Sequence, residues 1–269
     1  MLWNFIDKVY IITLSTSTQR QDELRIHLQE IGLHNYEFIV FDPISSYTKN
    51  DAKDVECSIM NIFSLTVVDK ISNDITHNHL KVVEKAYQNN FNRVLILEDD
   101  ARFILPIDET KITSASTWIE RNYCDMFYFG YCVWPLPVSI FVTPHIVKIP
   151  TPYCAHCYLL TRPGMQKILE YTKNMDKNNM NIHVDKLYTV IPGLYKYGIF
   201  PNLCFQSEDP GLYKRALKKI LPNELYVPFN YTVRTFDYIS IIVPIVVILI
   251  LCFIIMKMIT NVSQKFFNI

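Results

Sequence analysis

The stretch RVLILEDDARF, residues 93–103, is decisive for the fold and points to a site. Residues 94–97 are all apolar, and a short strand with no polar position is typical of a sheet that is covered on both faces. Three acids then follow without a spacer: Glu98, Asp99 and Asp100. Because adjacent carboxylates repel one another, this acidic triplet raises the question of which cation balances it.

Strand and helix patterns alternate along most of the chain. Strands are expected over 8–14, 37–41, 93–97, 125–129 and 156–160, and helices over 18–31, 76–87, 163–172 and 184–191. This alternation predicts an α/β fold with a mainly parallel sheet and helices on both faces. In such sheets ligands bind beyond the carboxyl ends of the strands, which is where the acidic triplet falls.

The spacing of the acids predicts a divalent metal site. If strand geometry continues past residue 97, Glu98 and Asp100 share one face and lie about 6.7 Å apart. Two carboxylates so placed can hold a divalent ion directly or through water, so Mn²⁺ or Mg²⁺ is expected, brought in with a diphosphate. The alternative is an acidic turn after a buried strand that binds nothing.

Other protein classes in which acidic residues follow an apolar strand fit this sequence less well. Gly193 and Gly198 have the separation of a P-loop, but Ile199 and Phe200 follow where Lys and Ser or Thr are required. Neither G-x-S-x-G nor G-x-G-x-x-G occurs. Lys+Arg and Asp+Glu number 26 each, so the formal net charge is zero and no nucleic-acid partner is predicted.

The cysteines are predicted to be reduced, because the seven of them show no compact disulfide spacing. Cys154 and Cys157 have the separation of half a zinc site, but no second such pair exists. Since the segment continues into Tyr158-Leu159-Leu160, thiols in a core strand are the favoured interpretation.

Residues 239–256 form an uncharged run, ISIIVPIVVILILCFIIM. At ~1.5 Å per residue it spans roughly 27 Å, which predicts a transmembrane helix over 237–257. A catalytic domain over 1–221 and a linker over 222–236 precede it, and a short tail over 258–269 follows. The N-terminus does not read as a secretory signal, so a single-pass, tail-anchored protein with a cytosolic domain is expected. The alternative is a buried core helix.

Several blocks of sequence resemble glycosyltransferase family 25, which includes lipopolysaccharide-biosynthesis glycosyltransferases and procollagen galactosyltransferases. The central block is HNHLKVVEKAYQNNFNRVLILEDDARF, with His79 and the acidic triplet at the family's motif positions. VYIITL with Arg20 resembles the first strand, and AHCYLLTRPGMQKIL a later strand and helix. HVDKL and FPNLCFQSEDPGL resemble the closing blocks. The likeness covers roughly residues 8–212.

The resemblance implies a GT-A-like fold and the transfer of a hexose, of which galactose is one candidate. The donor is expected to be a nucleotide-sugar, most simply UDP-linked, and the acceptor a hydroxyl of a glycan, lipid or protein at a membrane surface. Glu98 and Asp100 are then the metal ligands, and donor binding is assigned to Thr13, Arg20 and Asp99.

An inverting transfer also needs a base for the acceptor hydroxyl. Asp185 is the first candidate and His79 the second. Both base candidates have a purely structural alternative: Asp185 as an acid favoured at a helix start, and His79 as a packing or capping residue. Arg20, assigned to donor binding, has the alternative of a solvated charge at a helix start. Thr13 and Asn78 stand where the family has Asn and Ser. They keep open a second hypothesis, a catalytically inactive membrane-anchored binding or scaffold protein of the same fold.

Overall fold

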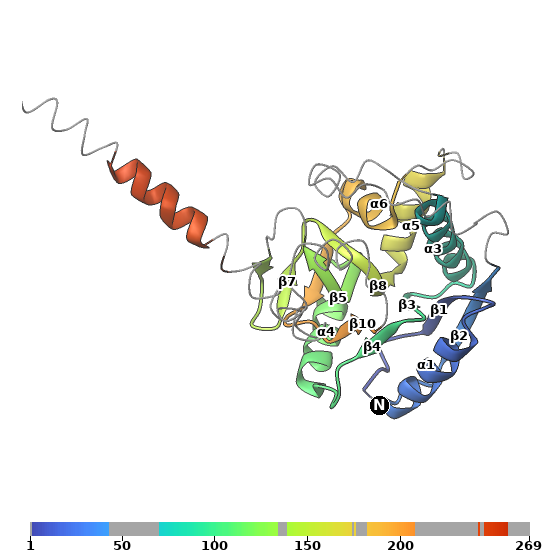
Figure 1. Ribbon diagram of the computed structural model, residues 1–269. Helices are drawn as coiled ribbons and strands as arrows, with labels where there is room; N and C mark the ends of the chain where they lie inside the picture. The colour runs from blue at the N-terminus through green and yellow to red at the C-terminus, as the bar shows by residue number, and fades with distance from the viewer. Residues whose placement is uncertain are drawn as a thin grey trace, which may run out of the picture.

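The computed structural model describes residues 2–42, 70–133, 139–173, 175, 182–207, 242 and 245–257. An eight-stranded sheet forms the centre of the fold (Figure 1). In sheet order its strands are β2 (Tyr36–Phe41), β1 (Lys8–Leu14), β3 (Arg93–Glu98), β8 (Pro152–Thr161), β5 (Met126–Val133), β9 (Lys196–Ile199), β7 (Ile146–Lys148) and β6 (Ile140–Phe141). A separate antiparallel pair joins β4 (Ala101–Phe103) to β10 (Cys204–Gln206).

The sheet is mixed, so the prediction of a mainly parallel sheet is wrong. β1 runs parallel to β2 and β3, and β5 runs parallel to β9. β8 is antiparallel to both β3 and β5, and β7 is antiparallel to β6 and β9. A parallel crossover needs a long connection, usually a helix. Because the described chain between β5 and β8 contains only the short strands β6 and β7, β8 can return antiparallel.

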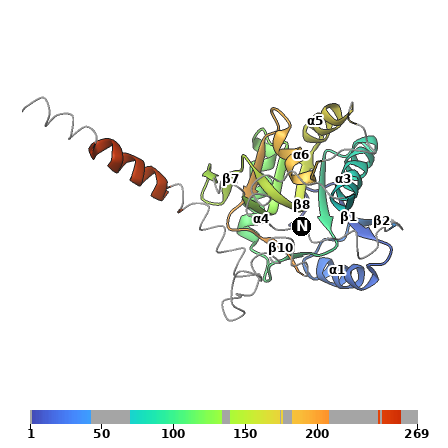
Figure 2. The same ribbon diagram turned by 45° about the horizontal axis from the view of Figure 1, so that its top comes forward.

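Two layers of helices cover the sheet (Figures 1 and 2). One face is covered by α3 (Lys70–Gln88), α5 (Arg162–Thr172) and α6 (Val184–Val190), and the other by α1 (Thr18–Glu30) and α4 (Glu109–Arg121). Successive residues of β3 alternate between the two cores: Val94 and Ile96 belong to the first, and Leu95 and Leu97 to the second. This alternation explains why residues 94–97 are all apolar.

One helix begins earlier than expected. α3 begins at Lys70, six residues before the expected start at residue 76, so Thr76 lies inside the helix, where its hydroxyl donates to the Ile182 carbonyl at 2.8 Å. α1 begins at Thr18 as expected, and the side chain of its N-cap residue, Ser17, makes no capping bond. Pro163 lies in the first turn of α5, as its fixed φ favours.

The C-terminal segment corrects a second prediction. In the described part of the chain, no helix has both the length and the apolar character needed to cross a membrane. The predicted transmembrane helix over 237–257 is therefore wrong, and with it the single-pass, tail-anchored placement of a cytosolic domain. The predicted linker, 222–236, and tail, 258–269, lie outside the described residues.

Candidate functional site

The acidic triplet lies at the carboxyl end of β3, the strand between β1 and β8 in the sheet. β3 ends at Glu98, and Asp99 and Asp100 form a turn that leads into β4. The strand geometry assumed for a shared face of Glu98 and Asp100 therefore does not continue through Asp100. Asp99 and Asp100 are buried, whereas 24% of the Glu98 side chain is exposed.

Glu98 faces the layer of α3. Its Oε1 lies 3.1 Å from Nε2 of His79, and its Oε2 accepts a hydrogen bond from the Gln206 amide at 3.0 Å. Burial alone would raise the pKa of Glu98, but the bond and the charge of His79 hold it below its usual value. Glu98 is therefore a carboxylate, and its oxygens are acceptors only.

His79 is fully buried and has both ring nitrogens engaged. Because the Glu98 carboxylate can only accept, Nε2 of His79 donates to it, and Nδ1 lies 2.7 Å from the Tyr158 hydroxyl oxygen. The Tyr158 oxygen in turn lies 3.0 Å from the Tyr188 hydroxyl. This buried relay, Tyr188–Tyr158–His79–Glu98, fixes the orientation of the Glu98 carboxylate.

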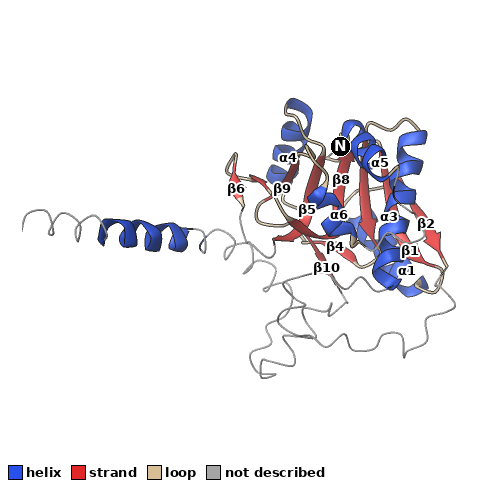
Figure 3. Ribbon diagram, turned by 90° about the horizontal axis from the view of Figure 1, so that it is seen from above, coloured by secondary structure: helices blue, strands red, loops and turns tan. Residues whose placement is uncertain are grey.

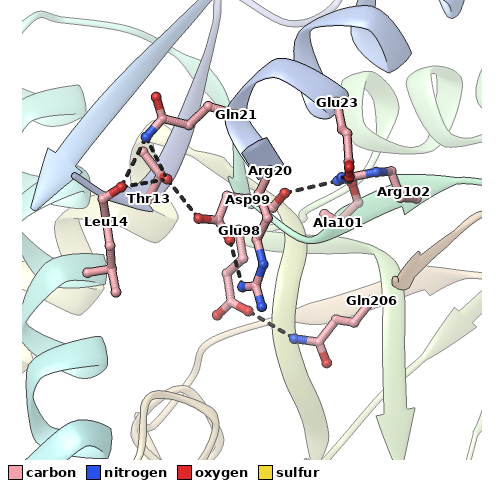
Figure 4. A network of polar contacts seen from close by, with 10 residues as sticks. All are labelled: Thr13, Leu14, Arg20, Gln21, Glu23, Glu98, Asp99, Ala101, Arg102 and Gln206. Atoms are coloured by element: carbon pink, nitrogen blue, oxygen red, sulfur yellow. Dashed lines mark hydrogen bonds and ion pairs between the residues drawn. The ribbon is translucent and has the colours of Figure 1, made fainter. Parts of the chain in front are cut away.

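Asp99 turns to the opposite layer, toward α1 (Figure 4). Its Oδ2 accepts from the Thr13 hydroxyl at 2.7 Å, and its Oδ1 lies 3.3 Å from Nη1 of Arg20. The three residues assigned to donor binding, Thr13, Arg20 and Asp99, are thus brought together from β1, α1 and the turn after β3. Glu98, the last residue of β3, thus faces the layer of α3, and Asp99, the next residue in the turn, faces the layer of α1, so each has its own partners.

Asp100 has a different environment from its two neighbours. It is 5% exposed, and its Oδ1 is buried without a hydrogen-bond partner. Burial and the charge of Glu98 raise the pKa of Asp100 to about 7. A buried, unpartnered carboxylate oxygen beside a second carboxylate fits a cation, which would satisfy the oxygen and remove the repulsion.

The described residues contain no group of three or more His, Cys, Asp and Glu side chains arranged around a metal position. Glu98 and Asp100 are therefore too few to enclose an ion by themselves. Mg²⁺ characteristically takes one or two carboxylates and completes its coordination with water and substrate phosphates. The residues present fit an ion of that kind, whose remaining ligands come with the donor.

Asp185 lies in the first turn of α6 and points back to β8. Its Oδ1 accepts from the Ala155 backbone N–H at 2.9 Å, and the Cys154 N–H also bonds it. Burial raises the pKa of this half-buried carboxyl, the two N–H groups lower it, and the charge of Glu98 raises it further. Cys154 has a left-handed φ of 71°, an uncommon conformation that directs this stretch of backbone at the carboxylate.

His156 is a site residue that sequence reasoning missed. It is buried, and neither ring nitrogen has a hydrogen-bond partner of ordinary geometry. Burial would lower the pKa of His156, but the Cys204 sulfur and the carboxylates of Glu98 and Asp100 raise it to about 9. A Cβ on Gly130 would collide with the His156 ring and the Cys204 carbonyl, so a glycine is required there. A histidine inside the apolar run 155–160 was the available signal.

Among the cysteines that the structure describes, Cys154 differs from the expected reduced state. Cys154 is disulfide-bonded, whereas Cys124, Cys157, Cys204 and Cys252 are free thiols. Cys157 is buried, as predicted for a core strand, so the pair does not act as half a zinc site.

Comparison with known proteins shows a resemblance to one family over part of the chain. Residues 6–117 match the model described as glycosyltransferase family 25 (LPS biosynthesis protein). The match includes β1, α1, α3, β3 and the acidic triplet, and it confirms the resemblance predicted from the central block. It supports an enzyme that transfers sugar. No curated protein matches the chain.

Several solved structures share the general course of the chain. One is A197 from STIV, with 10% identity and a TM-score of 0.42, covering 75% of this chain and 86% of that one. Another is a glycosyltransferase involved in the glycosylation of the major capsid of PBCV-1, with 12% identity and a TM-score of 0.39, covering 76% of this chain and 82% of that one. A third is UDP-glucose pyrophosphorylase complexed with UDP-glucose, with 9% identity and a TM-score of 0.39, covering 72% of this chain and 90% of that one. With TM-scores below 0.5, these structures add nothing to the functional assignment.

Proposed function

We propose, from the resemblance of residues 6–117 to glycosyltransferase family 25, that the chain transfers a hexose from a nucleotide-sugar to an acceptor hydroxyl. Asp100 is the observation that carries the proposal, because its buried carboxylate oxygen lacks a partner beside Glu98. A carboxylate left in this state costs stability unless a cation satisfies it. The proposed catalytic domain comprises residues 1–221, which include Asp100 and the carboxyl end of β3.

Mn²⁺ or Mg²⁺ is the proposed cofactor, with Asp100 and Glu98 as its protein ligands. When bound, the ion neutralises the negative charge that develops on the diphosphate leaving group. Glu98 comes to this role already oriented, since His79 and Gln206 each hold one of its oxygens. The residues of the chain therefore supply a fixed carboxylate and an unpartnered one.

Arg20 is the proposed contact for the donor phosphates. Its side chain is 36% exposed and lies against Asp99, which also accepts from the buried Thr13. Asp99 therefore holds Arg20 at the edge of the site, and Thr13 holds Asp99. A guanidinium so placed can donate to a diphosphate, and the family match includes all three residues.

Asp185 is the proposed base for the acceptor hydroxyl. It is half-buried, lies within the electrostatic reach of Glu98 and His79, and has a pKa raised by burial, which makes it a better proton acceptor. His79 is less suited to that role, because it is fully buried and both nitrogens are bonded. We therefore assign His79 to the positioning of Glu98.

Calorimetric titration of the full chain with UDP, with and without Mn²⁺, tests the metal site. Asp100→Asn should weaken Mn²⁺-dependent UDP binding at least about tenfold, because it removes a charged ligand worth ~1.4 kcal/mol or more. Glu109→Gln is the matched control, since Glu109 is exposed at the start of α4 and away from the site. Equal UDP binding by Asp100→Asn and the parent would remove the carboxylate from the site.

Hydrolysis of a panel of UDP-hexoses with Mn²⁺ tests the chemistry itself. Release of UDP from one hexose donor would support the proposal and identify the sugar. Normal binding of UDP with no hydrolysis of any donor would favour the alternative of an inactive protein with the same fold.

A further inference from the structure

A cavity of about 500 Å³ opens at the edge of the sheet opposite to the acidic triplet. It lies where β3 begins, α4 ends and α5 begins, and Arg93, Asn122 and Pro163 are part of its wall. Arg93 and Glu98 are the two ends of β3, so a rise of ~3.3 Å per residue separates this cavity from the triplet by roughly 17 Å. A site here is therefore independent of the proposed donor site.

An exposed tyrosine forms one wall of the cavity. The Tyr123 side chain is 63% exposed, and its ring meets the Tyr195 ring edge-on, with 5.3 Å between centroids. The Lys167 ammonium lies 5.0 Å from the first ring and 5.2 Å from the second. These contacts hold the Tyr123 ring in place while its surface remains open. A rigid, amphipathic ring of this kind gives contact area to a ligand at a low entropic cost.

The charges around the cavity are paired. Arg93 lies 3.1 Å from Glu120, and Lys167 lies 2.7 Å from Asp125. Because each of these cations is matched by an acid, the cavity offers no excess positive charge for a phosphate or another anion. The polar groups of the wall instead present both hydrogen-bond donors and acceptors, which suits an uncharged ligand.

Asp125 adds an unsatisfied acceptor. Its side chain is buried, and its Oδ2 accepts from Lys167 at 2.7 Å and from the Tyr195 backbone N–H at 2.8 Å. Its Oδ1 is buried and has no hydrogen-bond partner. A carboxylate oxygen accepts only, so it requires a donor such as a hydroxyl group or a water molecule held by one.

We propose that this cavity is a saccharide-binding site, separate from the donor site. The open face of Tyr123 packs against the apolar C–H face of a sugar ring, and the sugar hydroxyls bond the polar wall around Asn122 and Asp125. The ligand class is a neutral hexose, alone or within a glycan. The proposal does not rest on the proposed transferase function, because it concerns binding at the far edge of the sheet.

Saturation-transfer NMR on the full chain, with galactose, glucose and mannose at millimolar concentration as probes, tests this site. At least one of the three should show transfer to its ring C–H protons. Tyr123→Ala should weaken that binding about tenfold, or ~1.4 kcal/mol, because it removes the aromatic face against which the sugar packs. Tyr171→Ala is the matched control: Tyr171 is 41% exposed on α5 and is not part of the cavity wall.

Competition separates this site from the other candidates. Neither UDP with Mn²⁺ nor inorganic phosphate should displace the sugar. Absence of transfer from all three sugars, or equal binding by Tyr123→Ala and Tyr171→Ala, would overturn the proposal. Displacement by phosphate would make the cavity an anion site, and displacement by UDP would place the sugar at the acidic triplet. Either result also refutes it.

Discussion

The two ends of β3 differ in how nearby basic side chains pair with their acids. At the amino end of β3, Asp125 is paired with Lys167, and Glu120 is paired with Arg93. At the carboxyl end, Glu98, Asp99 and Asp100 stand together: Arg20 contacts Asp99 and His79 contacts Glu98, whereas Oδ1 of Asp100 has no hydrogen-bond partner. Burial and the carboxylate of Glu98 raise the pKa of Asp100 to about 7, so its charged form is disfavoured in the fold. The comparison teaches that the carboxyl end disfavours the charge of Asp100, and a cation that comes with a ligand is expected to offset this cost.

The largest effect is expected from the chemistry at the carboxyl edge. Asp185→Asn should lower turnover by ~10²–10⁴-fold, the usual contribution of a general base. Donor affinity should stay within about twofold, because the donor is assigned to other residues. Steady-state kinetics with calorimetric donor binding checks both. Lost donor binding would make Asp185 a binding residue, and a lower melting temperature with normal turnover would make its role structural.

A loss of stability is expected from a substitution at the amino end of β3. Lys167→Met removes the ammonium beside the buried Asp125 and should lower the free energy of unfolding by roughly 3 kcal/mol or more. For a protein of this size the melting temperature should fall by roughly 6–12 °C. Lys111→Met is the control, since its partner Asp108 is 42% exposed, against a buried Asp125, and such a partly exposed pair is worth at most about 1 kcal/mol. Similar losses in the two variants would contradict the contrast between buried and exposed pairs.

Substitution of Asp100, an acid of the triplet, is expected to raise the stability of the metal-free fold rather than lower it. The pKa of Asp100 is raised to about 7 in the folded protein, above the value of ~3.9 expected when unfolded. The folded state therefore binds its proton more tightly, and this contribution to stability is lost as pH rises through about 7. In the presence of a chelator, Asp100→Asn should raise the melting temperature at pH 8 by at least ~2 °C and change it little at pH 4. A lower melting temperature at pH 8 would show that the carboxylate stabilises the metal-free fold.

The smallest effect is expected at the far end of the buried relay. Tyr188→Phe removes the hydroxyl that bonds Tyr158 but leaves the His79–Glu98 contact in place. It should cost about 1 kcal/mol of stability, the usual net value of one hydrogen bond, with Mn²⁺-dependent UDP binding unchanged. Denaturant unfolding and calorimetry measure the two quantities. Weaker UDP binding would extend the functional role of the relay as far as Tyr188.

Local patterns predicted most elements of the fold. The apolar run at 94–97 indicated a strand covered on both faces, and the helix expected over 76–87 lies within α3. The direction of β8 could not be predicted, because it depends on the short strands β6 and β7, two and three residues long, which leave no clear periodicity. The transmembrane prediction relied on hydropathy, and no helix among the described residues is long and apolar enough to bear it out.

The site was predicted in composition more than in geometry. The sequence placed the triplet at a strand end and named Thr13 and Arg20 beside it, and the structure brings these residues into contact with Asp99. The bonds of His79 to Glu98 and Tyr158 depend on how α3 packs on the sheet, which no local pattern encodes. His156 was missed for the same reason, since its neighbours Glu98, Asp100 and Cys204 come from other strands and turns.

The alternation of β3 between two cores has a consequence for how the sequence can change. Because side chains repeat every second residue, one inserted or deleted residue in this strand would exchange its faces. Glu98 would then turn toward the layer of α1 and Asp99 toward the layer of α3, so Arg20 and His79 would each lose the carboxylate it contacts. The length of β3 is thus under tighter constraint than its composition: conservative exchanges among Val, Leu and Ile are tolerable, whereas a frame change of a single residue is not.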